Sequence, residues 1–132
     1  MTHTFPIRIF YEDTDLAGVV YYANYLKYIE RARSDVVEQL GLDQRAMRED
    51  GTVFVITRVE AYYIKAARFA DRLEVRSTHF AEGRLRWVFD QEVWRGDDLI
   101  FKARVTAVCM TVEGKPRRLP AELRSQLPDA VN

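Results

Sequence analysis

The stretch that decides the fold is NYLKYIERARSDVVEQLG, residues 24–41, where the apolar period changes to that of a helix. Apolar side chains three or four residues apart form one stripe, made of Tyr25, Ile29, Ala32, Val36 and Leu40. Gly41 ends the stretch, and Leu42 is placed for the apolar contact that accompanies a Schellman cap. The pattern predicts one long helix over residues 24–40.

Strands are predicted on both sides of this helix. Alternation from Phe5 to Ile9 indicates a first strand, and a short helix is expected from its N-cap Asp43 to Glu49. Four more strands are expected over residues 53–63, 73–80, 85–94 and 99–109. In the last of them, every second residue from Leu99 to Cys109 is apolar and forms one face. The order predicts an antiparallel sheet packed on one helix.

One helix cannot cover both faces of a five-stranded sheet. The uncovered face is expected to carry Val88 and Trp94, and the pair Tyr62-Tyr63 places one aromatic ring on each face. An apolar patch of this kind usually marks a partner surface, so we expect a homo-oligomer.

Length, charge and composition limit the class of protein. The 132 residues are expected to form a single domain, residues 1–132. The formal net charge of +0, from 20 basic and 20 acidic residues, argues against a nucleic-acid binder, which needs a basic surface. No signal-peptide pattern opens the chain and no apolar run approaches the ~20 residues that span a bilayer, so we expect a cytoplasmic protein without a transmembrane segment. A single cysteine, Cys109, agrees with a reducing compartment.

Several common catalytic motifs are missing from the sequence. The dinucleotide fingerprint, the phosphate-binding loop and the nucleophile elbow of serine hydrolases are all absent. His3 is expected in a frayed terminus, and His79 in the core or at an interface, so neither is a candidate base. Metal chemistry would need carboxylate ligands, and the candidate segment that remains lies between the first strand and the long helix.

The segment YEDTDLAGVVYYANY, residues 11–25, has the parts needed to hydrolyse an acyl group. Glu12, Asp13 and Asp15 bring three carboxylates together, and Gly18 permits a tight turn. Asp15 would attack the acyl carbon or deprotonate a water molecule, while a free N–H at the helix start would hold the oxyanion. A turn that merely uses Asp and Thr for local hydrogen bonds is almost as good an interpretation. A metal site is not expected, because three acids within four residues are too few to close one.

The same residues resemble a known family. The run from Asp13 to Tyr25, followed by Glu30-Arg-Ala-Arg33, resembles the signature of the hotdog-fold acyl-CoA thioesterases of the 4-hydroxybenzoyl-CoA thioesterase family. Within this family, the chain is most similar to the Tol-Pal-associated acyl-CoA thioesterases of bacteria. The segments ARFADRL, residues 67–73, and GKPRRLP, residues 114–120, extend the resemblance over almost the whole chain.

The resemblance implies an α+β hotdog fold, in which a five-stranded antiparallel sheet wraps around one long central helix. Dimers, often paired into tetramers, would hold the active sites at the dimer interface. It also implies an acyl-CoA thioesterase that releases a carboxylic acid and free CoA. Asp15 would be its nucleophile or general base, and the backbone N–H of Tyr22 its oxyanion donor. No cofactor is expected, because CoA is part of the substrate.

Coenzyme A carries phosphates, which need basic partners. By resemblance, the nucleotide and pyrophosphate would bind at strand ends that carry Arg84, Arg86, Lys115, Arg117 and Arg118. Arginine suits such contacts because its guanidinium can donate two parallel hydrogen bonds to one phosphate.

Other functions remain open at this point. The main alternative is a non-catalytic acyl-binding or scaffold module in an envelope-associated complex. A dehydratase on the same fold is a weaker one, because residues 15–40 contain no histidine. Glu30 could be a helix-borne carboxylate of the site, but an ion pair with Arg33 three residues later is the favoured interpretation.

Overall fold

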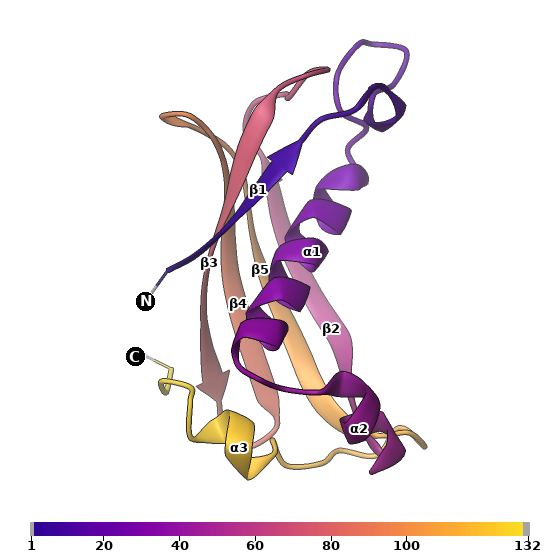
Figure 1. Cartoon of the computed structure of the whole chain (residues 1–132), viewed down its shortest axis with the longest axis vertical. Coiled ribbons are helices and arrows are strands. Elements are labelled where there is room, and N and C mark those ends of the chain that lie inside the picture. Colours follow the sequence, from indigo (N-terminus) through magenta and orange to yellow (C-terminus); the bar gives the residue numbers. More distant parts are fainter. Residues whose placement is uncertain (1, 131–132) are drawn as a thin grey trace.

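The structure is a computed structural model that describes residues 2–130, in which one sheet curves around a long helix (Figure 1). Its strands are β1 (His3–Arg8), β2 (Thr52–Tyr63), β3 (Arg72–Glu82), β4 (Arg86–Arg95) and β5 (Asp98–Thr111). Its helices are α1 (Asn24–Gln39), α2 (Gln44–Glu49) and α3 (Ala121–Arg124), with a 3-10 turn, η1, at Tyr11–Asp13. The predicted helices and strands are confirmed to within about two residues at each end, whereas α3 was not predicted.

The strand order is β1-β3-β4-β5-β2, and every neighbouring pair is antiparallel. β3, β4 and β5 follow one another through tight turns at Gly83 and Gly96. β2 pairs with β5 instead of β3, so residues 64–71 cross one end of the sheet to reach β3. β1 and β2 are therefore the two edge strands.

α1 lies across the inner face of the sheet and packs its apolar stripe into the core (Figure 1). The buried members of this stripe are Tyr25, Tyr28, Ile29, Ala32 and Val36. The helix ends in the predicted Schellman cap. Gly41, at φ +75°, donates its N–H to the carbonyl of Glu38 (3.0 Å), and Leu42 donates to that of Val37 (3.3 Å).

A polar network crosses this core and ties α1 to the sheet. Gln91 on β4 is only 1% exposed, and its Nε2 donates to the carbonyl of Ile29 (2.9 Å) and to Ser77 Oγ (3.0 Å). Its Oε1 accepts a hydrogen bond from Arg33 Nη1 (2.9 Å). Both ends of the buried amide are therefore satisfied, as burial of such a group requires.

The outer face of the sheet differs from the expected apolar patch. Val88 is 2% exposed because its neighbours in the sheet, Phe80 and Thr106, flank it. Trp94 is half-buried under the guanidinium of Arg76, whose Cζ lies 4.5 Å from the ring centroid. The prediction that Val88 and Trp94 form an exposed partner surface is therefore wrong.

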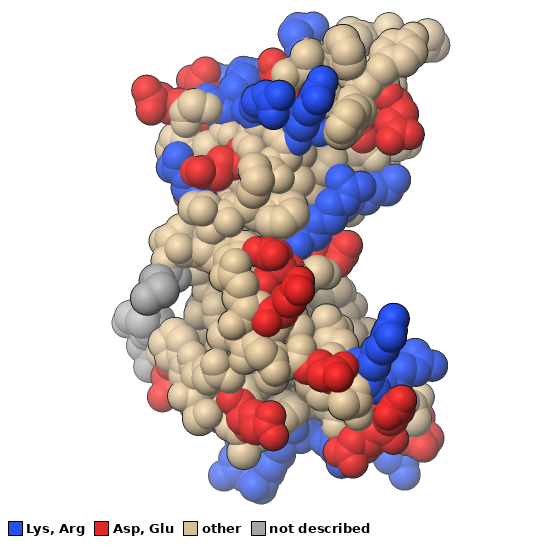
Figure 2. Space-filling model, in the orientation of Figure 1, with Lys and Arg blue, Asp and Glu red and all other residues tan. Residues whose placement is uncertain are grey.

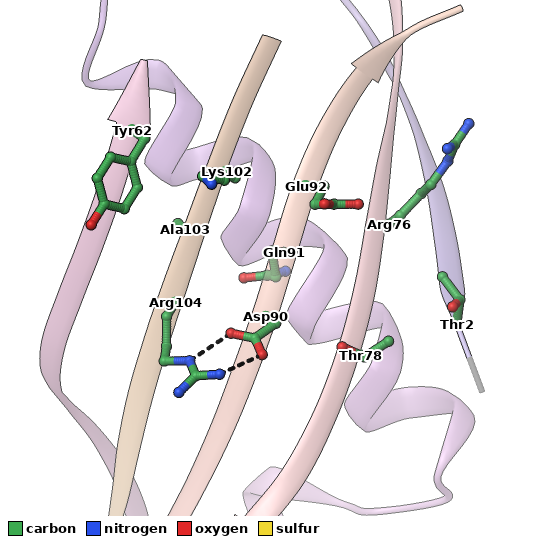
Figure 3. Close-up of a pocket in the computed structure, with 10 residues that line it drawn as sticks. All are labelled: Thr2, Tyr62, Arg76, Thr78, Asp90, Gln91, Glu92, Lys102, Ala103 and Arg104. Carbon is green, nitrogen blue, oxygen red and sulfur yellow. Dashed lines mark hydrogen bonds and ion pairs between the residues drawn. The ribbon is translucent and has the colours of Figure 1, made fainter. Parts of the chain in front are cut away.

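Charged side chains fill the centre of this outer face (Figure 3). Asp90 accepts two hydrogen bonds from Arg104, at 2.7 and 2.8 Å, across the β4–β5 pair. Glu92 and Lys102 are the next cross-strand neighbours. Charges at this density keep the outer face hydrated, so the sheet buries only its inner face against α1.

Three smaller predictions are also settled. Ile100 is an extra residue opposite the Val93–Trp94 step, and it turns Leu99 away from the apolar face that begins at Phe101. His3 is not frayed, because its Nε2 lies 2.7 Å from Asp35 Oδ2 on α1. His79 is half-buried, as expected, and its Nδ1 accepts a hydrogen bond from Trp87 (3.1 Å).

None of the helices within residues 2–130 is long and apolar enough to cross a membrane.

Replacing Gly41 by alanine tests the C-terminal cap of α1. A Cβ at this position would meet no atom within 4 Å, so only the left-handed backbone, at φ +75°, opposes the change. We expect Gly41→Ala to lower the free energy of unfolding by about 1 kcal/mol, measured by urea denaturation. Gly41→Asn should cost less, because asparagine tolerates this conformation better than alanine does. Equal stability of Gly41→Ala and the wild type would contradict the cap.

Candidate active site

The segment between β1 and α1 folds into a tight hairpin. Asp15 donates its N–H to the carbonyl of Val19 (2.9 Å), and Tyr21 donates to that of Asp13 (2.9 Å). Gly18 closes the turn at φ +79°, with its N–H on the carbonyl of Asp15 (3.0 Å). The left-handed backbone at Gly18 confirms the tight turn that the sequence indicated. The hairpin places Asp15 and the start of α1 in one small unit.

The carboxylate of Asp15 serves the turn with one oxygen. Oδ1 accepts a hydrogen bond from the N–H of Ala17 (2.9 Å), which fixes the orientation of the side chain. Oδ2 has no hydrogen-bond partner within residues 2–130, and the residue is exposed. The two interpretations of Asp15, turn residue and reactive carboxylate, are therefore compatible, because each uses a different oxygen.

The other two carboxylates of the segment do not join Asp15. Asp13 Oδ2 accepts a hydrogen bond from the N–H of Phe10 (2.7 Å), which holds that side chain at η1. Glu12 is exposed. Across residues 2–130, no three His, Cys, Asp or Glu side chains come together as metal ligands.

Tyr22 lies two residues before the start of α1 and carries a free backbone donor. Within the described chain its N–H donates to no acceptor, as is typical of the N–H groups at the start of a helix. Its carbonyl accepts a hydrogen bond from the hydroxyl of Tyr63 on β2 (3.1 Å), and the residue is 62% exposed. The geometry therefore leaves an unpaired N–H where the positive end of the α1 dipole lies.

Aromatic rings hold the start of α1 in place. Tyr25 stacks on Phe101, with ring centroids 5.0 Å apart, and its hydroxyl accepts a hydrogen bond from the N–H of Ala67 (3.0 Å). Tyr63 packs edge-on against Tyr25 at 5.6 Å. Sequence reasoning missed Tyr63 as a site residue, because the Tyr62-Tyr63 pair indicated only which face each ring occupies.

An apolar groove runs between α1 and β2, from Leu26 toward Val37. Two hollows of about 320 and 200 Å³ lie along it, and Glu30, Arg33 and Ile56 line both. The predicted Glu30–Arg33 ion pair is wrong. Glu30 accepts a hydrogen bond from Ser34 Oγ (2.5 Å), since the core amide of Gln91 holds the guanidinium of Arg33.

The predicted phosphate-binding arginines lie at the other end of the sheet. The start of β4 and the end of β5 bring together Arg84, Arg86, Arg117 and Arg118, with Lys115 beside them. Arg117 also donates to the carbonyl of Asp50 at the end of α2 (3.1 Å). Basic side chains gather at this lower end of the molecule among acidic ones (Figure 2).

The two predicted parts of the site are therefore far apart in one chain. The end of β4 lies near the hairpin, because Arg95 donates to the carbonyl of Ala66 and Val20 donates to that of Ala67. β4 has ten residues, and at ~3.3 Å per residue it spans about 30 Å. The arginines at its start cannot meet a group bound at Asp15 of the same chain without bridging this length.

Comparison with known proteins identifies the family. A model described as "Thioesterase-like superfamily" matches residues 11–127. The acyl-CoA thioester hydrolase YbgC of Escherichia coli is 33% identical over 120 residues, which cover 89% of this chain and 90% of that protein. A probable thioesterase from Bartonella henselae has a TM-score of 0.84 at 30% identity, covering 91% of this chain and 100% of its own.

A third protein supports the fold alone. The 1,4-dihydroxy-2-naphthoyl-CoA thioesterase of Synechocystis superimposes with a TM-score of 0.88 at 24% identity, over 95% of this chain and 94% of its own. The chain belongs to the thioesterase-like superfamily. The predicted family, the hotdog fold and the prediction of a thioester hydrolase are thereby confirmed.

Two buried tyrosines on α1 provide a matched test of the packing around the site. Among residues 2–130 the hydroxyl of Tyr28 finds no hydrogen-bond partner, whereas that of Tyr25 accepts from the N–H of Ala67. Burial, with the Asp13 carboxylate nearby, raises the pKa of Tyr28, so its hydroxyl stays neutral. We expect Tyr28→Phe to keep or slightly raise the free energy of unfolding, because it removes an unpaired polar group. Tyr25→Phe should lower it by about 1–3 kcal/mol, because it strands a buried N–H.

Urea denaturation of both variants beside the wild type measures this difference. The interpretation fails if Tyr28→Phe is the more damaging of the two.

Proposed function

We propose that the protein is an acyl-CoA thioesterase whose reaction centre is the hairpin at the start of α1. The observation that supports this best is the pairing of two unused groups in one small unit, the Oδ2 of Asp15 and the backbone N–H of Tyr22. The carboxylate oxygen can attack the thioester carbonyl carbon or activate a water molecule. The N–H can stabilise the oxyanion that forms on the thioester carbonyl. The acyl group would lie in the groove between α1 and β2, next to Leu26 and Val59.

Thioester chemistry suits this small set of groups. A thiol leaving group with a pKa near ~8.5 departs as the thiolate, so no strong general acid is needed. Asp15 would either form a mixed anhydride with the acyl group, releasing CoA thiolate, or take a proton from the attacking water. A single turnover in 18O-labelled water separates these routes, because only the anhydride route puts the label into the Asp15 carboxylate.

The distance between the hairpin and the arginines supports a homo-oligomeric enzyme. A second copy placed with its strands antiparallel to the first would bring its arginine-bearing end beside the hairpin of the first. Each reaction centre would then take Asp15 and Tyr22 from one chain and phosphate-binding arginines from the other. A cytoplasmic location remains a prediction from the sequence.

Replacing Asp15 by asparagine tests the proposed chemistry. Asparagine can keep the hydrogen bond from Ala17 but cannot act as nucleophile or base, so kcat should fall at least about a hundredfold. Thiol release from a panel of short, long and aromatic acyl-CoAs measures the rate, and circular dichroism checks the fold. Glu12→Gln, an exposed carboxylate three residues earlier, should keep its activity.

The outcome also decides between the two proposed classes. Undiminished turnover by Asp15→Asn would overturn the role of Asp15. Binding of acyl-CoA by the wild type without hydrolysis of any thioester in the panel would instead favour the acyl-binding module.

Replacing Arg118 by alanine tests the phosphate-binding end. Its side chain is exposed, so the change should spare the fold and raise KM several-fold, with kcat nearly unchanged. With an acyl thioester of dephospho-CoA, which lacks one phosphate, the difference in KM between variant and wild type should be smaller. Arg31→Ala, an exposed arginine on α1, serves as the control. An identical KM in all three proteins would remove Arg118 from the site.

A further inference from the structure

The peptide group that carries the free N–H of Tyr22 is held on one side by the start of α1. The carbonyl of this group, which belongs to Tyr21, accepts a hydrogen bond from the N–H of Asn24 (2.9 Å). A trans peptide group is planar, and its C=O and N–H point in opposite directions. The hydrogen bond from Asn24 therefore turns the Tyr22 N–H away from the helix and leaves it open to an outside acceptor.

The next peptide group is held less firmly by the helix. The carbonyl of Tyr22 accepts a hydrogen bond from the N–H of Tyr25, but its length of 3.4 Å exceeds the ~2.7–3.2 Å of ordinary N–H···O bonds. The two peptide groups share the Cα atom of Tyr22, so movement of the carbonyl changes the direction of the N–H. A second hydrogen bond to this carbonyl would therefore keep the N–H in one direction.

Tyr63 supplies this second hydrogen bond from the sheet. Its hydroxyl donates to the carbonyl of Tyr22 at 3.1 Å, and within residues 2–130 no other side chain hydrogen-bonds to the backbone of Tyr22. A carbonyl oxygen has two lone pairs, so it can accept from the Tyr63 hydroxyl and the Tyr25 N–H together. Removing the hydroxyl would leave this carbonyl with only the long bond of the helix.

The surroundings of Tyr63 fix the place of its hydroxyl. The residue ends β2 opposite Phe101, and the N–H that follows, of Ile64, donates to the carbonyl of Ile100 (2.9 Å). Its ring packs edge-on against Phe101 and Tyr25, with centroids 5.0 and 5.6 Å apart. Burial raises the pKa of Tyr63, so its hydroxyl stays protonated and can donate. A side chain set by a strand and two rings can hold another group precisely.

We propose that Tyr63 is a positioning residue that keeps the backbone N–H of Tyr22 directed at the oxyanion. The inference rests on the proposed function, because it concerns the same site, and it adds a residue from outside the hairpin. Tyr63 acts through the carbonyl of Tyr22 and so couples the end of β2 to the donor at the start of α1. The oxyanion forms only during the reaction, so loss of alignment should slow catalysis without weakening substrate binding.

Replacing Tyr63 by phenylalanine removes the hydroxyl and keeps the ring. We expect kcat to fall about tenfold, less than the ~hundredfold or greater cost of losing an oxyanion donor itself, while KM changes less than about twofold. Thiol release from the acyl-CoA that the wild type hydrolyses fastest measures both constants, and circular dichroism checks the fold.

Tyr62→Phe is the matched control. The ring of Tyr62 lies on the outer face of the sheet, with Lys102 Nζ 5.3 Å from its centroid (Figure 3). Because this hydroxyl is remote from the hairpin, kcat and KM of the control should equal those of the wild type.

Backbone relaxation tests the alignment without substrate. In protein labelled with 15N-tyrosine, the order parameter of the Tyr22 amide should fall in Tyr63→Phe from about 0.85, typical of a rigid backbone, toward about 0.6. Tyr62→Phe should keep the wild-type value.

The results separate this inference from the proposed function. An unchanged kcat in Tyr63→Phe, whether or not KM rises, would overturn the positioning role, and so would a Tyr22 order parameter equal to that of the wild type. Undiminished turnover by Asp15→Asn, with the effects of Tyr63→Phe intact, would overturn the role of Asp15 alone. A wild type that hydrolyses no acyl-CoA would overturn both.

Discussion

Ile29, Ala32 and Val36 pack α1 against the sheet with exposed fractions of 1%, 0% and 2%, and the other features of the molecule take their positions from this contact. It sets the start of the helix beside the crossing segment 64–71, where Tyr25 reaches the N–H of Ala67. The hairpin that carries Asp15 must then close in the short space between β1 and α1. The opposite flank of the helix is left facing the unpaired edge of β2.

The sequence alone was sufficient for features that depend on neighbouring residues. The stripe from Tyr25 to Leu40, the Gly41 cap and the turn at Gly18 all follow local rules of spacing and backbone conformation. Features that depend on distant residues were predicted less well. Helical spacing favoured a Glu30–Arg33 pair, but a core amide 58 residues further on holds Arg33 instead. Val88 was assigned correctly to the outer face, but its burial depends on Phe80 and Thr106, on other strands.

The candidate site shows the same division. Asp15 and Tyr22 lie close in sequence, so the motif that carries them could be found from its residues. The arginines at the far end of the sheet were grouped correctly, because short turns and strand ends bring them together. Their separation from Asp15 could not be seen in the sequence, since it depends on the direction in which β4 runs. Only the sheet order reveals that the arginines of one chain lie about 30 Å from its own Asp15.

Gln91 has a consequence for how the helix and sheet find their relative position. Apolar side chains tolerate a helix that slides by one turn, because one buried methyl group can replace another. The amide of Gln91 cannot accept such a slide, because its partners, the carbonyl of Ile29 and the guanidinium of Arg33, lie on successive turns of α1. Any other alignment would leave a buried donor or acceptor unpaired. A single polar side chain thus fixes the register of α1 on the sheet in an otherwise apolar contact. It excludes neighbouring registers that hydrophobic packing alone would allow.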